Sequence, residues 1–181
     1  TPCEHSFPTR RSSDLKEMSM LVYLPRCYNN STPLPVLYFL HGRSGDENIM
    51  FEMGINTKAD QMIKDGEIKP MIIVCPRIEN SRGVNSSLIC KEVSDLGDNN
   101  RIINVGMYED YFMKEIIFLT DKTFNTIKDR KGRYIGGASA GGYTALHNAF
   151  RHQHMFLKVG GHMPALELEI ENEDKIGRAH V

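Results

Sequence analysis

Two apolar runs that end in glycine or proline constrain the fold of this chain more than any other feature. They are "PVLYFLHG" at residues 35–42 and "PMIIVCP" at residues 70–76. Runs of this kind are typical of strands that are buried on both faces of a sheet. Other strands are predicted at residues 18–25, 133–137 and 155–161, and helices at residues 56–65, 109–128 and 142–152. This alternation predicts an α/β fold, with a mostly parallel sheet and helices on both of its faces.

The net charge and the short apolar runs exclude nucleic-acid-binding proteins and membrane-spanning proteins. A chain of 181 residues is expected to form one domain with a sizeable core. Its formal net charge is −1, which does not resemble the strongly basic surface of a nucleic-acid-binding protein. The apolar runs are far shorter than the ~20 residues that span a bilayer. We therefore expect neither a nucleic-acid partner nor a membrane span.

The two ends of the chain do not follow the pattern of the rest. Residues 5–15, "HSFPTRRSSDL", have no apolar periodicity, and their back-translation resembles a common short-read sequencing adapter. The last residues, "IGRAHV", back-translate to a string of the same kind. The sequence therefore predicts non-native tails at residues 1–15 and 176–181, around a truncated domain at residues 16–175. The alternative is a natural tail without regular structure at each end, and the underlying DNA read distinguishes the two.

The stretch "RYIGGASAGGYTALHNAF", residues 133–150, places four glycines around one serine. A dinucleotide fingerprint needs the spacing G-x-G-x-x-G, and Ala138 occupies the middle glycine position counted from Gly136. A P-loop ends in Gly-Lys followed by Ser or Thr, whereas here Tyr143 follows Gly142. The spacing therefore excludes both phosphate-binding loops.

The motif G-x-S-x-G does fit this stretch, and it predicts a nucleophile elbow. Ser139 is then the nucleophile on a sharp turn from a strand into a helix, and Gly137 and Gly141 let the two backbones pass closely. One oxyanion-hole donor is the amide of Ala140, and the second is expected to be the amide of Arg43, in the loop after an earlier strand. Both segments follow the carboxyl ends of strands, where sites form in such sheets. A glycine-rich turn without a catalytic role is the alternative.

Histidines near this motif are candidates for the catalytic base. His41 precedes the glycine turn before Arg43, and a structural role in that loop is expected in preference to catalysis. His162, in "GGHMPAL", precedes every acidic residue near the end of the chain, so it does not fit the order serine, acid, histidine. Solvated or capping roles are expected for the histidines of the helix after the elbow, which are His147, His152 and His154.

Five segments together resemble the esterase branch of the α/β-hydrolase superfamily, which includes esterase D (S-formylglutathione hydrolase), feruloyl and acetyl-xylan esterases and the mycolyltransferases. They are "LPVLYFLHGRSGDE", "KPMIIVCPR", "GMYEDYFMKEII", "RYIGGASAGGYTALHNAF" and "FLKVGGHMPAL", in the family's order through most of residues 18–166. The resemblance implies a serine carboxylesterase that forms an acyl-enzyme on Ser139, with no metal and no organic cofactor. It implies a small-molecule or carbohydrate-linked ester as the substrate.

The resemblance also bears on the walls of the substrate pocket. Many relatives have methionine where Ala140 stands, which implies a roomier pocket floor in this chain. The loop "RIENSRGVNSS" lies where relatives shape the acyl or alcohol pocket. Solvated positions are nevertheless expected for three of its residues, Arg77, Asn80 and Asn85.

The acid and the histidine of the triad are expected to be missing. In this fold both follow the nucleophile on later strands. The acidic residues after Ser139 form one polar run at residues 167–174, and His180 lies in the adapter-like tail. We therefore expect an incomplete α/β-hydrolase fold with little esterase activity of its own, because a serine hydroxyl without a base is a poor nucleophile.

Two other functions remain open at the level of the sequence. An acyltransferase could use the same triad and pass the acyl group to a sugar alcohol, since the choice of acceptor depends on pocket loops. A non-catalytic, hydrolase-like binding module is the second, although an intact Ser139 elbow argues against it. The sequence assigns neither a compartment nor an oligomeric state, because the true N-terminus is expected to be missing.

Overall fold

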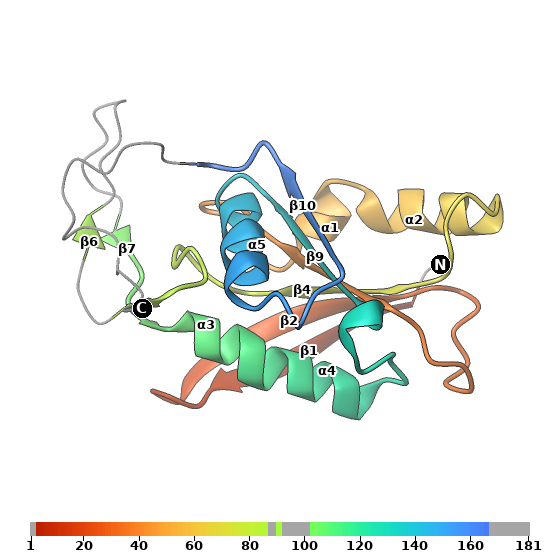
Figure 1. Cartoon of the computed structure of the whole chain (residues 1–181), viewed down its shortest axis with the longest axis horizontal. Helices are drawn as coiled ribbons and strands as arrows, with labels where there is room; N and C mark the ends of the chain where they lie inside the picture. The colour runs from red at the N-terminus through yellow and green to blue at the C-terminus, as the bar shows by residue number, and fades with distance from the viewer. Residues whose placement is uncertain (1–2, 87–89, 92–101, 167–181) are drawn as a thin grey trace.

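The structure is a computed structural model that describes residues 3–86, 90–91 and 102–166. Its main element is a six-stranded sheet with the strand order β1-β2-β4-β3-β9-β10 (Figure 1). The strands are β1 (Cys3–Arg11), β2 (Lys16–Leu24), β3 (Val36–Leu40), β4 (Ile72–Pro76), β9 (Arg133–Ala138) and β10 (Lys158–His162). Strands β3, β4, β9 and β10 are parallel, whereas β2 is antiparallel to both β1 and β4. The carboxyl ends of the four parallel strands therefore meet at one edge of the sheet.

Helices cover both faces of this sheet, as predicted, so the sheet forms the middle layer (Figure 1). The helices are α1 (Ile49–Glu52), α2 (Ile55–Lys64), α3 (Tyr108–Asp110), the π-helical η1 (Tyr111–Ile116), α4 (Ile117–Thr123), the 3-10 turn η2 (Arg130–Gly132) and α5 (Ala140–Arg151). Tyr23 and Ile73 pack toward α1 and α2 in one buried cluster. The adjacent Val22 and Val74 belong to the other cluster, which includes α4 and α5. Side chains of a strand alternate between faces, so both faces of β2 and β4 are buried.

The long helix predicted at residues 109–128 is wrong over its last turn. Helix α4 ends at Thr123, and Phe124 has an extended backbone with φ −118° and ψ 155°. The chain then runs beside Leu34, which donates its N–H to Asn125 O at 3.0 Å and accepts from Ile127 N–H at 2.9 Å. Pairing with this distant segment satisfies backbone groups that would otherwise continue the helix. Apolar periodicity at these positions therefore reports burial and not helix.

The region at residues 77–107, which begins with the loop "RIENSRGVNSS", contains short antiparallel ladders. Strands β5 (Asn85–Ser86) and β8 (Gly106–Met107) pair with one another, as do β6 (Cys90–Lys91) and β7 (Ile102–Ile103). Two-residue strands are too short to carry a period-2 signal, so the sequence does not reveal them.

Strand β1 lies in the region predicted to be a non-native tail, where the sequence analysis predicts no element. It pairs with β2 along its whole length. Phe7 contacts Phe124 edge to face, with the two ring centroids 5.5 Å apart. The Thr9 and Tyr111 hydroxyls lie 2.6 Å apart. An edge strand pairs through backbone groups, which depend little on the sequence. The pairing therefore does not show whether residues 1–15 are native, and their origin stays a prediction.

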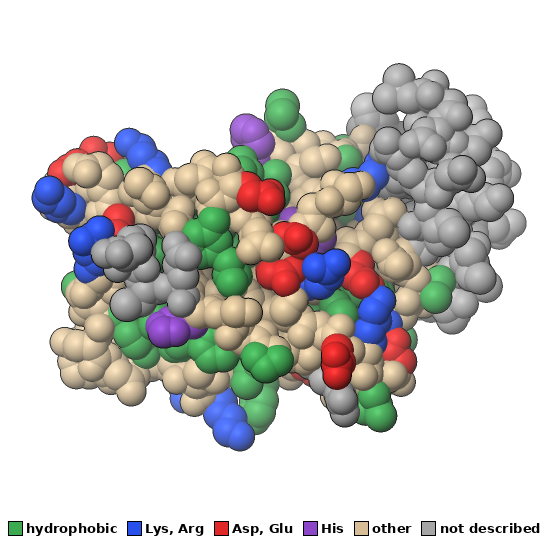
Figure 2. Space-filling view, turned by 180° about the vertical axis from the view of Figure 1, so that it is seen from behind, with side chains coloured by type: hydrophobic (Ala, Val, Ile, Leu, Met, Phe, Trp, Pro, Cys, Tyr) green, Lys and Arg blue, Asp and Glu red, His purple; other side chains and the backbone are tan. Residues whose placement is uncertain are grey.

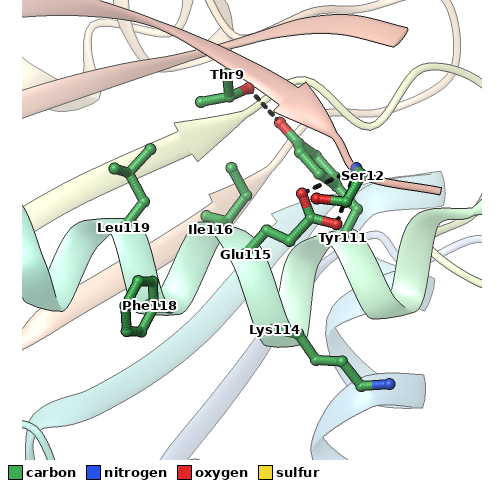
Figure 3. Close-up of a pocket in the computed structure, with 8 residues that line it drawn as sticks. All are labelled: Thr9, Ser12, Tyr111, Lys114, Glu115, Ile116, Phe118 and Leu119. Atoms are coloured by element: carbon green, nitrogen blue, oxygen red, sulfur yellow. Dashed lines mark hydrogen bonds between the residues drawn. The ribbon is translucent and has the colours of Figure 1, made fainter. Parts of the chain in front are cut away.

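A hollow of about 280 Å³ lies between the end of β1 and the helical segment that faces it. Figure 3 shows Tyr111 and Glu115 pointing toward β1, while Lys114 points away from it. The Glu115 carboxylate accepts the backbone N–H of Ser12 with both oxygens at 3.1 Å. Because this carboxylate is already satisfied by the protein, the hollow is a packing feature of the β1 edge rather than a candidate site.

The surface and the helices bear on the two excluded classes of protein. Seen from behind, acidic and basic side chains are interspersed, and this face shows no large area of one charge (Figure 2). Within the part of the chain that the structure describes, no helix has the length and apolar character needed to cross a bilayer.

Candidate active site

Ser139 lies where β9 ends and α5 begins, at the edge formed by the carboxyl ends of the parallel strands. Its backbone has φ 52° and ψ −117°, a conformation that glycine adopts easily and other residues adopt at a cost of about 1–3 kcal/mol. The side chain is exposed and does not cap the helix that it precedes. A serine hydroxyl is therefore presented to solvent beside the positive end of a helix dipole.

Backbone hydrogen bonds hold Ser139 in this strained conformation. Its N–H donates to His162 O at 2.9 Å, and its carbonyl accepts from Tyr143 N–H at 3.1 Å and from Ala165 N–H at 3.0 Å. The turn is thus fixed by α5 on one side and by the segment after β10 on the other. The side chain of His162 is itself exposed. This histidine contributes to the turn through its carbonyl, a role that the sequence does not predict.

The glycines on either side of Ser139 have no space for a side chain. A Cβ on Gly137 would lie 2.5 Å from the carbonyl carbon of Gly141. A Cβ on Gly141 would lie 2.1 Å from Leu40 O and 2.5 Å from His41 O. All of these atoms belong to the backbone and cannot rotate away. The close passage of strand and helix that the G-x-S-x-G spacing predicts is therefore present at both positions.

The structure brings the loop after β3 against Ser139. A Cβ on Gly42 would lie 3.3 Å from Ser139 Cβ and 3.2 Å from Ala138 O, so only glycine fits this contact without displacement. Arg43 is the next residue, and Ala140 is the first residue of α5. The amides at the start of a helix have no acceptor within the helix, so that of Ala140 can donate to a ligand. The predicted nucleophile and the two segments with the predicted oxyanion donors thus lie together.

His41 has a structural role in this loop, as expected. It is 1% exposed, its Nδ1 lies 2.8 Å from Gly42 O, and its Nε2 lies 3.0 Å from Ile78 N. Since a backbone N–H can only donate, Nε2 is the acceptor and Nδ1 carries the proton. Burial lowers the pKa of His41, which keeps the ring neutral. Both ring nitrogens are occupied by backbone groups, of Gly42 in this loop and of Ile78 after β4, so neither is available to Ser139.

We expect His41→Phe to lower the free energy of unfolding by about 2–3 kcal/mol, because it leaves the Ile78 N–H and the Gly42 carbonyl without their partner. Urea denaturation followed by circular dichroism measures this. The matched control is His154→Phe at an exposed position, where a change within about 0.5 kcal/mol is expected. Equal effects of the two substitutions on the free energy of unfolding would contradict the structural role of His41.

A polar hollow of about 370 Å³ adjoins the Arg43 loop. Its lining comes from the ends of β3 and β4 and from the segment before β8: Arg43, Ser44, Gly45, Arg77, Glu79, Asn80 and Asn104. Its position beside the predicted oxyanion donor makes it a candidate subsite for one arm of an ester.

Three residues of the loop "RIENSRGVNSS" that were expected to be solvated are half-buried and make defined contacts. Arg77 pairs with Glu47 at 3.3 Å, and the amide of Asn80 donates to Asn104 Oδ1 at 2.9 Å. Asn85 donates its side-chain amide to Asp110 at 3.2 Å. The solvated interpretation is therefore wrong for Asn80 and Asn85, which contact the distant Asn104 and Asp110, whereas the Arg77 side chain is 41% exposed.

The helix after the elbow holds a second difference from the prediction. His147, expected to be solvated or capping, instead faces the buried carboxylate of Glu109. His152 is the C-cap residue of α5, a capping position as expected, and its ring also faces that carboxylate. The candidate acids at residues 167–174 and His180 lie outside the described residues. Among the residues that are described, no three His, Cys, Asp or Glu side chains gather as a possible metal site.

Comparison with known proteins assigns the family. The family described as "Putative esterase" matches residues 13–172 of this chain. The chain belongs to that family. The assignment confirms the resemblance seen in the motifs, although the match begins inside the predicted N-terminal tail, so the domain boundaries stay predictions.

Solved structures of esterases share this fold. A ferulic acid esterase is 26% identical with a TM-score of 0.71, over 87% of this chain and 58% of its own. A ferulic acid esterase from Anaeromyces mucronatus, in complex with ferulic acid, is 22% identical with a TM-score of 0.73, over 90% and 58%. A fluorophosphonate-binding serine hydrolase from Staphylococcus aureus, with substrate bound, is 21% identical with a TM-score of 0.72, over 96% and 63%. This likeness confirms the α/β-hydrolase fold, and the chain spans 58–63% of the length of these relatives.

Proposed function

We propose that this chain carries the nucleophile and the oxyanion hole of a serine carboxylesterase. The observation that carries the proposal is the conformation of Ser139, an exposed non-glycine residue held at φ 52° between a strand and a helix. Strain of this kind persists only where the surroundings fix it, and it gathers at functional sites. Membership of an esterase family supports the same reading.

The chemistry follows from the position of Ser139. Its Oγ attacks the carbonyl carbon of the ester while a base accepts the hydroxyl proton. The carbonyl oxygen becomes an oxyanion, which the amides of Ala140 and Arg43 stabilise. The C–O bond to the alcohol then breaks, the alcohol takes a proton from the protonated base, and an acyl-enzyme remains. Water, activated by the same base, hydrolyses the acyl-enzyme and releases the acid.

The base and its acidic partner are proposed to come from outside the described residues. Of the histidines that pack nearest to Ser139, His41 is occupied by backbone groups, and His162 contributes its backbone carbonyl. The relatives are longer than this chain, which leaves room in them for further catalytic groups. Ferulate esters are the first substrates to test, since ferulic acid is bound in one of these relatives.

We expect the 181-residue chain alone to hydrolyse 4-nitrophenyl acetate no faster than its own Ser139→Ala variant, because an unassisted serine hydroxyl is a weak nucleophile. Initial rates at matched protein concentration measure this. Turnover by the chain that disappears in Ser139→Ala would show that a base is already present within it.

The proposed function itself is tested on the product of the complete gene, recovered from the source DNA. We expect it to hydrolyse 4-nitrophenyl acetate and methyl ferulate, and a fluorophosphonate to add one covalent mass at Ser139. A complete protein that folds but shows no Ser139-dependent turnover or labelling would overturn the proposal and favour a binding module. Transfer of the acyl group to an added alcohol, in preference to water, would identify an acyltransferase instead.

A further inference from the structure

We propose that Glu109 is a positioning residue that fixes helix α5 and, through it, the conformation of Ser139. This inference rests on the proposed function, because it assigns a role around the proposed nucleophile. Glu109 lies in α3, and it contacts α5 near the end opposite to Ser139. Its role is therefore to hold the helix, not to touch the substrate.

Three basic side chains of α5 and its C-terminus converge on the Glu109 carboxylate. His152 Nε2 lies 2.8 Å from Oε1, and Arg151 Nε donates to the same oxygen at 3.1 Å. His147 Nε2 lies 3.8 Å from Oε2. Both carboxylate oxygens thus face the last turns of one helix, which restrains both its rotation and its position along its axis.

The environment of Glu109 makes these contacts strong. The residue is 6% exposed, so solvent screens the contacts less than it would at the surface. The contacts with His147 and His152, together with the charge of Arg151, lower the pKa of Glu109 to about 2 against the opposing effect of burial. The carboxylate is therefore ionised throughout the neutral range. Removing the partners of a buried charge is strongly destabilising, so these contacts restrain the helix.

A line of contacts connects Glu109 to the elbow. The ring of His147 stacks on that of Tyr143, with centroids 5.9 Å apart and planes inclined by 23°. The guanidinium of Arg82, itself 4% exposed, lies over the same Tyr143 ring at 5.8 Å. The amide of Tyr143 donates to Ser139 O at 3.1 Å. Displacement of the last turns of α5 would therefore reach Ser139 in two steps.

The start of α5 needs such support because its first residues have a low helix propensity. Gly141 and Gly142 occupy its first turn, and glycine is less favourable than alanine in a helix. Glycine is required at Gly141 by the contact with Leu40 O, so this weakness cannot be removed locally. The strained turn at Ser139 adds to it. A restraint at the far end of the helix offsets both.

The test is amide hydrogen exchange by NMR on the 181-residue chain, comparing it with Glu109→Gln. The reporters are the amides of Ser139 and Tyr143, both hydrogen-bonded at the elbow. The reference is the amide of Ile72, which donates to Pro35 O at 2.9 Å in the sheet and reports global unfolding. We expect exchange at the two elbow amides to accelerate tenfold or more beyond the change at Ile72.

Other outcomes overturn the inference. If all three amides accelerate by the same factor, Glu109 contributes only to global stability. If the elbow amides are unchanged, it holds only the end of α5. The matched control is Asp110→Asn, which removes the neighbouring carboxylate with its contacts to Lys114 and Asn85 but leaves the contacts of Glu109 with α5. It should leave the exchange rates of the elbow amides within twofold.

A second variant keeps the test decisive if Glu109→Gln does not fold. Arg151→Gln removes a single partner of Glu109 at a position 38% exposed, and the same selective acceleration at the elbow is expected. Because exchange requires no reaction at Ser139, the result is independent of fluorophosphonate labelling, which reports on the proposed function.

Discussion

Replacing Gly141 by alanine is expected to lower the free energy of unfolding by about 3 kcal/mol or more. The new methyl group would lie 2.1 Å from Leu40 O and 2.5 Å from His41 O, so the end of β3 and the start of α5 must separate. Overpacking a well-filled interior typically costs about 1–3 kcal/mol, and here the obstructing atoms belong to the backbone. Helix propensity acts in the opposite direction, since alanine is better than glycine in a helix by about 1 kcal/mol.

Urea denaturation followed by circular dichroism distinguishes these two effects by their sign. The matched control is Gly160→Ala in β10, where an added Cβ meets no atom within 4 Å. That substitution should change the free energy of unfolding by less than about 1 kcal/mol. A neutral or stabilising Gly141→Ala would mean that α5 does not pack on the end of β3 as described, and the proposed geometry of the site would fail with it.

Replacing Ser139 by glycine is expected to stabilise the protein while it abolishes the proposed chemistry. Glycine removes strain of about 1–3 kcal/mol at φ 52° and ψ −117°. It also gains about 0.5–1 kcal/mol of conformational freedom in the unfolded chain, which reduces the benefit. We expect a net increase of about 1 kcal/mol in the free energy of unfolding. Ser139→Ala retains the strain and should leave stability almost unchanged.

The pair of variants separates the strain from the chemistry. In the proposed full-length esterase, both should lose turnover of methyl ferulate by a factor on the order of 10³ or more, because neither has a nucleophile. Only Ser139→Gly should also be more resistant to urea. If Ser139→Gly is less stable than Ser139→Ala, the positive φ of Ser139 is not a source of strain in the folded protein.

The layer order and the elbow could be predicted from the sequence because each has a short-range cause. The apolar runs at β3 and β4 report burial directly, and the glycines at 137 and 141 report a close approach of backbones. The elbow motif and the glycine turn after an earlier strand also indicated Ala140 and Arg43 as proposed donors, and their segments lie beside Ser139.

The contacts of Glu109 and the early end of α4 could not be predicted, because both depend on contacts between distant segments. Nothing in the sequence around Glu109 shows that its carboxylate meets His147, Arg151 and His152, which follow about forty residues later. An acidic residue at the start of a helix is normally explained by the helix dipole. The early end of α4 has the same cause, since hydrogen bonds with the distant Leu34, Tyr28 and Asn30 hold its last predicted turn in an extended conformation.

The hydrogen bonds between Ser139 and the segment after β10 have a consequence for dividing this chain into two fragments. Ser139 donates to His162 O and accepts from Ala165 N–H, so the turn is shared by segments on either side of residues 152–157. A cut at residues 152–157 would leave the serine on one fragment and two of its backbone partners on the other. The serine would then regain its conformation only when the fragments reassociate. A cut at residues 65–71, between α2 and β4, would keep these partners together and give no such dependence.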